Sequence, residues 1–304
     1  MSNILSTIGN TPLVDVSGLL PLPPRTQVLA KVEGSNPGGS IKDRPALRMV
    51  REAERTGALR PGMTIVEATS GNTGIALAMI GAALGYRLHI IMPACVSNER
   101  RSIITAFGAE LELSPAAKGT DGAIDRARSL TASRPQDYFM PDQFNNAANV
   151  RSHYETTGPE IYQQTAGHVD IVVAGIGTGG TLMGIGHYLR EIRPGIKIFG
   201  VEPGIGHKIQ GLKNMTESEV PGIFDRTLLD GIVRIDDEEA FMATRLLAVK
   251  AGIFSGISSG AALAGSWRIV RDFPGRSVVT ILPDRGERYL SASLFRSYCG
   301  KCPP

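Results

Sequence analysis

The sequence predicts an α/β protein built on twisted, mainly parallel sheets, and three observations lead to this fold class. Short runs rich in Val and Ile alternate with longer segments rich in Ala and Leu over most of the 304 residues. The alternation starts near residue 63 and starts again at residue 170, and neither block contains a repeat of fixed period. Because parallel strands are joined through helices, this alternation indicates two α/β units with parallel sheets.

The elements of both units can be placed in order. In the first unit, predicted strands occupy 64–68, 88–93 and 110–114, and predicted helices occupy 46–57, 75–85, 99–108 and 121–132. The segment 137–153, rich in Asn and other polar residues, is the expected crossover. In the second unit, strand patterns lie at 170–177, 197–203 and 277–283, and helical patterns lie at 187–193, at 238–252 and from residue 259.

Composition excludes several functions. With 42% hydrophobic residues, a net charge of +3 and no dense Lys/Arg run, the chain is not expected to bind nucleic acid or a membrane surface. No stretch approaches the roughly 20 apolar residues of a membrane span and the start lacks a signal-peptide pattern, so we expect a cytoplasmic protein. Cys95, Cys299 and Cys302 cannot form a disulfide framework. The Cys299–Cys302 spacing is that of half a zinc site or a redox pair, but no second CxxC completes it, so no metal is predicted.

The first of four candidate loops contains Lys42. Turn residues at 36–39 lead into a helical pattern, so Ser40 is a candidate N-cap and Lys42 is expected in the first helical turn. The positive end of the helix and the nearby Arg44 predict a lowered pKa for the Lys42 amine. A neutral amine is the nucleophile that Schiff-base chemistry needs, although a lysine considered alone is more often a solvated surface residue.

The second loop, residues 67–74, joins a predicted strand to a predicted helix. Its polar side chains are Thr69, Ser70, Asn72 and Thr73. At the carboxyl edge of a parallel sheet, such hydroxyls and backbone amides can hold a carboxylate. A plain helix cap needs only one Ser or Thr, so the group indicates a binding loop.

The third loop, residues 175–181, also follows a strand and precedes a helix, so its successive backbone amides can cradle a phosphate. It spells GxGxxG, and Glu202 ends the next strand where a dinucleotide-binding fold keeps its ribose-binding acid. A nicotinamide enzyme is therefore an alternative. Thr178 and Thr181 favour a terminal phosphate, because their hydroxyls add donors to the cradle.

The fourth loop, residues 256–262, opens an Ala-rich helix and, taken alone, needs no role beyond a serine cap. In order with the other three loops, however, it resembles the fold-type II pyridoxal-phosphate family and, within it, the cysteine synthases, or O-acetylserine sulfhydrylases. The matching motifs are TIGNTPLV (7–14), NPGGSIKDR (36–44), TSGNTG (69–74), QFNN (143–146), GTGGT (177–181), GISSG (256–260) and GERYL (286–290). Ala147 and the charged pair Asp284–Arg285 depart from the family pattern.

The resemblance implies a role for each loop. Lys42 forms the internal aldimine with pyridoxal phosphate, Asn72 contacts the phenolic oxygen of the cofactor and Ser258 contacts its pyridine nitrogen. The phosphate cradle comprises Gly177, Thr178, Gly179, Gly180 and Thr181. The substrate carboxylate is held by Thr69, Ser70, Thr73 and Gln143, and Ser70 is a candidate catalytic residue beside Lys42. Lys213 lies where some relatives keep a basic residue over the site, although a solvated loop lysine is an equal alternative.

The resemblance also implies an architecture: two three-layer α/β domains like those of tryptophan synthase β. The smaller domain would span 35–145, and the larger, phosphate-binding domain would combine 1–34 with 146–304. A homodimer is the usual assembly of the family.

The implied reaction is β-replacement on O-acetyl-L-serine. Lys42 removes the Cα proton, acetate leaves to give bound aminoacrylate, and sulfide adds to yield L-cysteine by ping-pong kinetics. The neutral Ser258 weakens the ring as an electron sink, which favours elimination over transamination. Segments at 67–80, 153–165 and 248–260 are similar to the B-type branch, which accepts bulkier donors such as thiosulfate to give S-sulfocysteine. O-phosphoserine sulfhydrylase, cystathionine β-synthase and serine dehydratase are alternatives, and a non-catalytic cofactor-binding regulator is a distant one.

Overall fold

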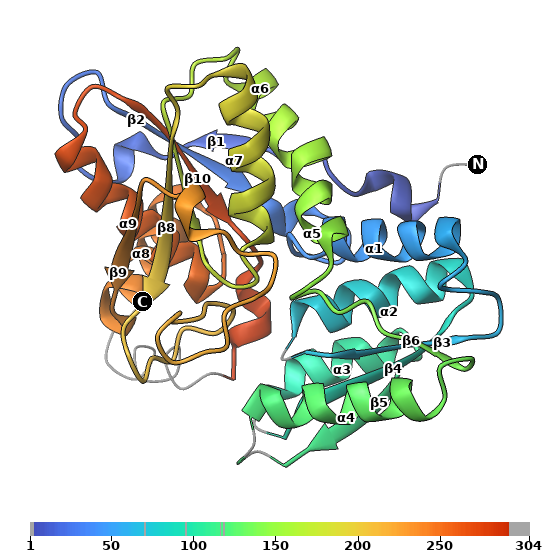
Figure 1. Cartoon of the computed structure of the whole chain (residues 1–304). Coiled ribbons are helices and arrows are strands. Elements are labelled where there is room, and N and C mark those ends of the chain that lie inside the picture. Colours follow the sequence, from blue (N-terminus) through green and yellow to red (C-terminus); the bar gives the residue numbers. More distant parts are fainter. Residues whose placement is uncertain (1–2, 70, 95, 116, 118, 292–304) are drawn as a thin grey trace.

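The molecule consists of two sheets with helices on both faces (Figure 1). The structure is a computed structural model that describes residues 3–69, 71–94, 96–115, 117 and 119–291. The larger sheet has the strand order β1-β2-β10-β7-β8-β9, and the smaller has the order β5-β4-β3-β6. Within the described residues, every neighbouring pair of strands is parallel except β1 with β2. The predicted fold class, two α/β units with mainly parallel sheets, is confirmed.

The larger sheet is buried on both faces. Its strands are β1 (Leu13–Asp15), β2 (Gln27–Val32), β7 (Ile171–Gly175), β8 (Lys197–Pro203), β9 (Gly231–Ile235) and β10 (Ser277–Leu282). Helices α8 (Asp237–Ala251) and α9 (Ile257–Asp272) cover one face, and α7 (Gly180–Ile192) covers the other. Along β7, Val173 packs in the core under α9, whereas Val172 packs in the core under α7. Burial on both faces explains the continuous Val/Ile runs of these strands.

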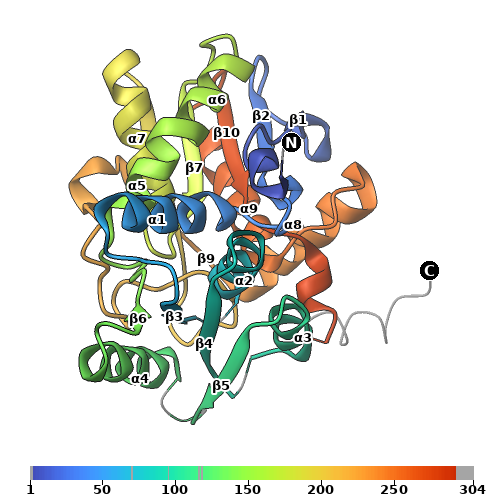
Figure 2. The ribbon, with the colours of Figure 1, turned by 90° about the vertical axis from the view of Figure 1, so that its right-hand side faces the viewer.

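The smaller sheet has the same three-layer construction. Its strands are β3 (Thr64–Ala68), β4 (Arg87–Pro93), β5 (Glu110–Ser114) and β6 (Tyr138–Phe139). One face packs on α1 (Asp43–Thr56), α2 (Asn72–Leu84) and α3 (Asn98–Ala106), and the other packs on α4 (Gly119–Ser133). Along the chain, the two units are connected by α5 (Ala147–Ser152), the π-helical turn η5 (His153–Thr157) and α6 (Gly158–Gln164). Helix α1 contacts both α2 and α5, so it lies where the units meet (Figure 2).

Some elements were not predicted from the sequence. Strands β1, β2 and β9 have no counterpart among the predictions, and the expected crossover contains β6 and α5. Strand β2 carries Lys31, which makes its pattern look half-exposed, yet this lysine is fully buried. Only the fold supplies the partners that make such burial possible.

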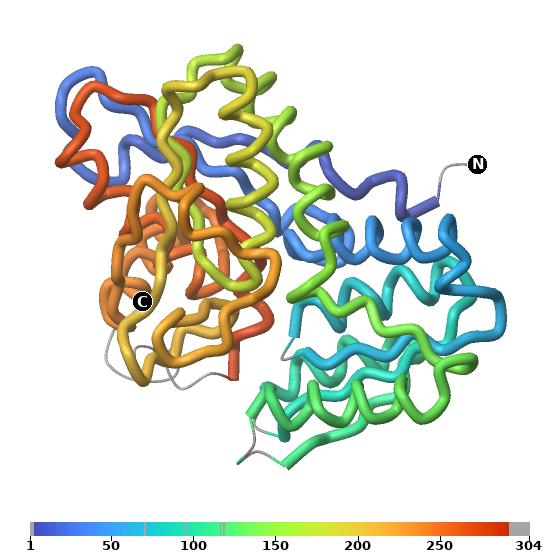
Figure 3. The backbone as a smooth tube through the Cα atoms, in the orientation of Figure 1, coloured from blue at the N-terminus to red at the C-terminus, as the bar shows by residue number. Residues whose placement is uncertain are grey.

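A strand from the N-terminal part of the chain pairs with a strand from the C-terminal part in the larger sheet. Strand β2 pairs with β10 along its whole length, from Gln27 opposite Ser277 to Val32 opposite Leu282, and Figure 3 shows the blue and red segments side by side. This strand membership supports the proposed domain division, in which residues 1–34 join residues 146–304. None of the described helices is both long and apolar enough to cross a bilayer.

Candidate active site

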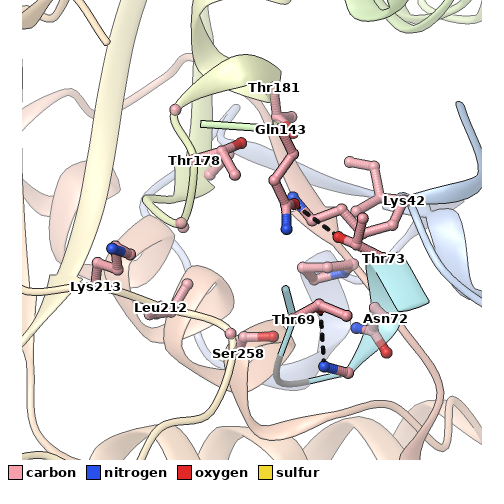
Figure 4. Close-up of a pocket in the computed structure, with 18 of the residues that line it drawn as sticks. Lys42, Thr69, Asn72, Thr73, Gln143, Thr178, Thr181, Leu212, Lys213 and Ser258 are labelled. Carbon is pink, nitrogen blue, oxygen red and sulfur yellow. Dashed lines mark hydrogen bonds between the residues drawn. The ribbon is translucent and has the colours of Figure 1, made fainter. Parts of the chain in front are cut away.

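The four loops surround one cavity of about 190 Å³ between the two units (Figure 4). Most of the predicted site residues line it: Lys42, Thr69, Asn72, Thr73, Gln143, Gly177, Thr178, Gly179, Thr181, Lys213 and Ser258. Gly180 is buried just behind this surface, and Ser70 lies outside the described residues. Side chains that are far apart in the sequence therefore share one enclosed space.

Lys42 stands immediately before α1 and not within its first turn, so the predicted N-cap at Ser40 is wrong. Ser40 forms a β-bridge with Asp284, which keeps its backbone extended. The helix begins only at Asp43, whose Oδ2 accepts a hydrogen bond from Gly38 N at 2.5 Å. These contacts fix the turn before and after Lys42 and leave its side chain on the cavity wall.

Burial lowers the pKa of the Lys42 amine to about 8. The predicted direction is confirmed, but the predicted cause is wrong. Arg44 is held away by Glu33 and Glu160, with nitrogen–oxygen distances of 2.6 to 2.8 Å. Although part of the Lys42 side chain faces the cavity, no residue that the structure describes pairs with Nζ, so nothing offsets the loss of bulk water. At mildly alkaline pH a large fraction of this amine is uncharged and nucleophilic.

Thr69, Thr73 and Gln143 form one wall of the cavity. The Thr73 hydroxyl donates to Gln143 Oε1 at 2.7 Å, and this bond joins α2 to the crossover segment (Figure 4). Gly71 N donates to Thr69 Oγ1 at 3.1 Å, which leaves the Thr69 proton available. Helix α2 begins here without a side-chain cap. Its first N–H groups and the neighbouring hydroxyl are the donors that a carboxylate needs.

Sequence reasoning missed Glu67, whose carboxyl supports this wall next to Gln143. Glu67 Oε2 accepts a hydrogen bond from Asp142 N at 3.0 Å, next to Gln143. Burial, together with the nearby Asp142 charge, raises the pKa of the Glu67 carboxyl to about 8, so it is mostly protonated at neutral pH. An acid at the end of the otherwise apolar strand TIVEA was the available sequence signal.

The loop from Gly177 to Thr181 has the backbone geometry of a phosphate cradle. Gly179 adopts a φ of +84°, a conformation that favours glycine. A Cβ on Gly177 would lie 2.7 Å from the carbonyl oxygen of Gly211, so the loop tolerates no side chain there. Helix α7 starts at Gly180 without a side-chain cap from Gly179, which leaves the N–H groups of Thr181 and Leu182 available to an anion.

Two hydroxyls complete the cradle. Thr178 Oγ1 accepts hydrogen bonds from Gly180 N at 3.3 Å and from Asn149 Nδ2 at 3.1 Å, which leaves its own proton free to donate. Thr181 Oγ1 lies 3.3 Å from Nε2 of His153. Burial holds the pKa of His153 well below its usual value, so this imidazole is neutral. Side-chain and backbone donors together fit a phosphate monoester.

Ser258 and Lys213 occupy other parts of the wall. Ser258 lies in the first turn of α9 and is almost fully buried. The Lys213 ammonium lies 4.6 Å from the centre of the Phe144 ring, and burial lowers its pKa. Both side chains lie within the cavity lining, where the resemblance places them.

The cavity has an excess of positive charge. Lys42, Arg100 and Lys213 line it, and no Asp or Glu does so in the part of the chain that the structure describes. Arg100 was not predicted, because a helical pattern alone does not show which arginine of an E-R-R run faces inward. Its guanidinium lies 4.7 Å from the centre of the Tyr289 ring, and its buried Nε has no hydrogen-bond partner in the part of the chain that the structure describes. Anionic ligands suit such a lining.

Neither a dinucleotide site nor a metal site finds support. Glu202, the acid expected to bind a ribose, accepts from Arg234 Nε at 2.7 Å and is not part of the cavity lining. The described residues contain no group of three or more His, Cys, Asp or Glu that could hold a metal ion. Cys95, Cys299 and Cys302 lie outside the described residues.

Comparison with known proteins identifies the family. The model of the pyridoxal-phosphate dependent enzymes matches residues 4–284. Cysteine synthase from Aquifex aeolicus is 48% identical over 299 residues, which are 96% of this chain and 91% of that protein. Cysteine synthase B from Escherichia coli is 46% identical over 295 residues, 97% of this chain and 96% of that enzyme, and enzymes named cysteine synthase A are also among the relatives. The crystal structure of cysteine synthase from Entamoeba histolytica superposes with a TM-score of 0.92 at 41% identity, covering 97% of this chain and 91% of the other. The chain therefore belongs to the cysteine synthase family of pyridoxal-phosphate-dependent enzymes.

Proposed function

We propose that the protein makes L-cysteine and acetate from O-acetyl-L-serine and sulfide in cysteine biosynthesis. In this reaction the Cβ–O bond breaks, a Cβ–S bond forms, and a proton leaves Cα and returns to it. The observation that carries the proposal is the convergence of three features on one cavity: a lysine with a lowered pKa, a wall of carboxylate donors and a phosphate cradle. Family membership supports the same chemistry.

Pyridoxal phosphate, when bound, supplies an aldehyde for the substrate amine and an electron sink for the charge at Cα. Gly177 to Thr181 would hold its phosphate, Asn72 its phenolic oxygen and Ser258 its ring nitrogen. The free donors of the cradle fit the phosphate, and the neutral Ser258 hydroxyl does not keep a proton on the ring nitrogen as a carboxylate would. Lys42 is the attachment point and, once released, the base that takes the Cα proton and returns it.

Thr69, Thr73 and Gln143 orient the substrate through its carboxylate. The Thr73–Gln143 hydrogen bond supports this role, because it holds the start of α2 and the crossover segment together at one place. Ser70 remains part of the proposal as a carboxylate ligand and candidate catalytic residue. Fixing the carboxylate at this wall leaves Cα within the same cavity as the Lys42 amine.

The positive lining favours an anionic sulfur donor. We propose hydrosulfide as the main donor and thiosulfate as a second one that gives S-sulfocysteine, in line with the B-type sequence segments. Lys213 supports this step, because its ammonium lies on the cavity wall over an aromatic ring and forms no ion pair with a carboxylate of the described residues.

The test is a spectral titration of the purified holoenzyme with product analysis. O-acetylserine should change the visible absorption of the bound cofactor, sulfide should restore it, and cysteine should accumulate. An unchanged spectrum with O-acetylserine would overturn the proposal. Parallel reactions with O-phosphoserine, with serine plus homocysteine and with serine alone distinguish the O-phosphoserine sulfhydrylase, cystathionine synthase and dehydratase alternatives. Replacing sulfide by thiosulfate tests the second donor.

We further propose a cytoplasmic homodimer, which the family resemblance implies. Light scattering coupled to gel filtration should give twice the 32.4 kDa mass of the chain, and a monomer at micromolar concentration would contradict the assembly. Fractionation of cells that express the protein tests the location.

A further inference from the structure

The GERYL motif and the charged residues before it have no role in the proposed reaction, yet they contact three of the four loops. Ile41 N, in the Lys42 turn, donates to Pro283 O at 2.8 Å. Gly256 N, at the start of the Ser258 loop, donates to Asp284 O at 3.1 Å. Arg288 reaches the second loop at Asn72. The segment 283–289 is therefore a common support for the cofactor-binding side chains.

Two buried charged groups hold the Asn72 amide. Arg288 Nη1 donates to Asn72 Oδ1 at 2.6 Å, and Asn72 Nδ2 donates to Asp284 Oδ2 at 2.7 Å. The Tyr289 hydroxyl also donates to Asp284 Oδ2, at 2.6 Å, so this oxygen acts as an acceptor. Arg288 and Asp284 are 5% and 2% exposed, and water therefore competes little for these bonds.

These partners allow only one orientation of the amide. A guanidinium can only donate and an ionised carboxylate can only accept. A reversed Asn72 would place its NH₂ group against Arg288 and its carbonyl against Asp284, and both hydrogen bonds would be lost. With Oδ1 and one N–H engaged, the second N–H of Nδ2 has no partner among the described residues, and Asn72 lines the cavity.

We propose that Arg288 and Asp284 are positioning residues that orient the Asn72 amide so that its free N–H is offered to the phenolic oxygen of the cofactor. This inference rests on the proposed contact of Asn72 with that oxygen. The charged residue at position 284, a departure from the family pattern, thereby acquires a function. It supplies the acceptor that selects the amide orientation.

The same guanidinium also ties Asn72 to the Lys42 turn. Arg288 Nη2 donates to the carbonyl oxygen of Gly38, and Gly38 N donates to Asp43 Oδ2. The planar fork of Arg288 thus bonds both the turn that carries Lys42 and the amide of Asn72. A lysine ammonium cannot reproduce this two-armed geometry.

The experiment measures cofactor affinity and spectrum in Arg288→Met, Arg288→Lys, Asn72→Ala and the double variant Asn72→Ala/Arg288→Met. We expect Arg288→Met to weaken binding of pyridoxal phosphate to the apoprotein roughly tenfold, the equivalent of one hydrogen bond with a charged partner. Its absorption maximum and the pH midpoint of that band should shift in the same direction as in Asn72→Ala. Arg288→Lys should show a smaller shift, because it restores one donor.

The double variant separates positioning from general destabilisation. If Arg288 acts through Asn72, Arg288→Met should leave the absorption maximum and its pH midpoint unchanged in the Asn72→Ala background, while loss of the Arg288 bond to Gly38 O still lowers affinity. Tyr289→Phe is the matched control, because it removes a bond to the same Asp284 oxygen without touching the amide. It should lower thermal stability and leave the spectrum unchanged. If Arg288→Met does not fold, the spectrum and the cofactor affinity of Arg288→Lys and Asp284→Ala are compared with those of Asn72→Ala instead.

Different failures have different meanings. A native spectrum and affinity in Asn72→Ala would overturn the proposed contact of Asn72 and this inference with it, while leaving β-replacement open to its own assay. Altered Asn72→Ala with native-like Arg288→Met would overturn the positioning role alone. A spectral shift in the double variant beyond that of Asn72→Ala would also overturn it.

Discussion

Two buried lysines, Lys31 and Lys42, show how neighbouring regions of one protein put the same side chain to different uses. The Lys31 ammonium is fully enclosed and donates to Thr11 O at 2.7 Å, to Glu160 Oε2 at 2.7 Å and to Gln164 Oε1 at 2.8 Å. The Lys42 amine has no partner among the described residues, and burial lowers its pKa to about 8. Burial also lowers the pKa of Lys31, but the hydrogen bond and the charge of Glu160 oppose this shift, whereas no described residue opposes it at Lys42.

The comparison extends to the two regions as a whole. Around Lys31, every strong cation faces a carboxylate, since Arg44 joins Glu33 and Glu160. Around Lys42, the described lining holds cations without carboxylates. The first region is balanced internally and links the N-terminal segment, α1 and α6. The positive charge around Lys42 is neutralised only when anionic ligands bind, which is typical of an anion-binding site.

Replacing the unpaired lysine should have the largest effect. Lys42→Met keeps the aliphatic stem and removes the amine that is proposed to serve as attachment point and base. We expect cysteine formation to fall at least about a thousandfold, within the range for loss of a general base and nucleophile. Steady-state assays with O-acetylserine and sulfide measure it, and circular dichroism verifies the fold. Turnover within tenfold of the parent would contradict the role of Lys42.

The same substitution at the paired lysine should act on stability instead. Lys31→Met leaves Glu160 with one cation fewer in a buried cluster, and we expect a loss of about 3 kcal/mol in the free energy of unfolding. The value of kcat should change less than twofold. Urea unfolding of the apoprotein measures the first quantity and a saturation assay the second. A stable Lys31→Met with low kcat would reverse the assignment of the two regions.

The stability of apo Lys42→Met should move in the opposite direction and depend on pH. The folded-state pKa of Lys42, about 8, lies below the unfolded value of 10.5, so the unfolded chain binds more protons between these values. The Lys42 penalty is therefore complete below pH 8 and disappears as the pH rises towards 10.5. Lys42→Met should be more stable than the parent at pH 7, by up to about 3 kcal/mol from the pKa difference, with a shrinking advantage above pH 8. Urea midpoints at pH 7, 8, 9 and 10 provide the check, and a pH-independent difference would refute the burial argument.

A cation at the edge of the cavity should have a smaller effect. Lys213→Gln removes positive charge near the proposed entry of the sulfur donor, so we expect the KM for thiosulfate or hydrosulfide to rise about threefold to tenfold at low salt. Lys208→Gln is the matched control, because Lys208 is exposed on the same loop and does not line the cavity. Equal effects of both substitutions would mean that only net charge matters. A rise in KM for O-acetylserine alone would assign Lys213 to the amino-acid substrate.

The smallest effect is expected at a partly exposed ion pair. Arg48→Gln breaks the contact between Arg48 and Glu155, whose nitrogen–oxygen distance is 2.7 Å. Because both side chains are accessible to water, unfolding free energy should change by less than about 1 kcal/mol. Thermal denaturation of Arg48→Gln and Lys31→Met in parallel compares the two losses of stability. Similar losses in both variants would show that burial does not separate the two clusters.

The sequence could predict much of the core and the loops but not every strand. Strand β3 coincides with the predicted run at 64–68, because a strand buried on both faces is a continuous apolar segment. Strand β2 escaped prediction because its apolar pattern is interrupted by Lys31 and its partner β10 lies at the other end of the chain. The loop at Lys42 was identified, yet its cap was misplaced, because the bridge from Ser40 to Asp284 spans most of the sequence.

By itself, the sequence determined the α/β class, the four loops and the lysine, threonine and glycine residues suited to cofactor and carboxylate binding. These follow from local periodicity and from residue types at short spacing. Only the tertiary structure decided that Lys31 is paired while Lys42 has no partner among the described residues, that Arg100 faces the cavity, and that Arg288 and Asp284 hold Asn72. The physical reason is that burial and charge pairing depend on groups such as Glu160 for Lys31 and Arg288 for Asn72, which only folding brings together.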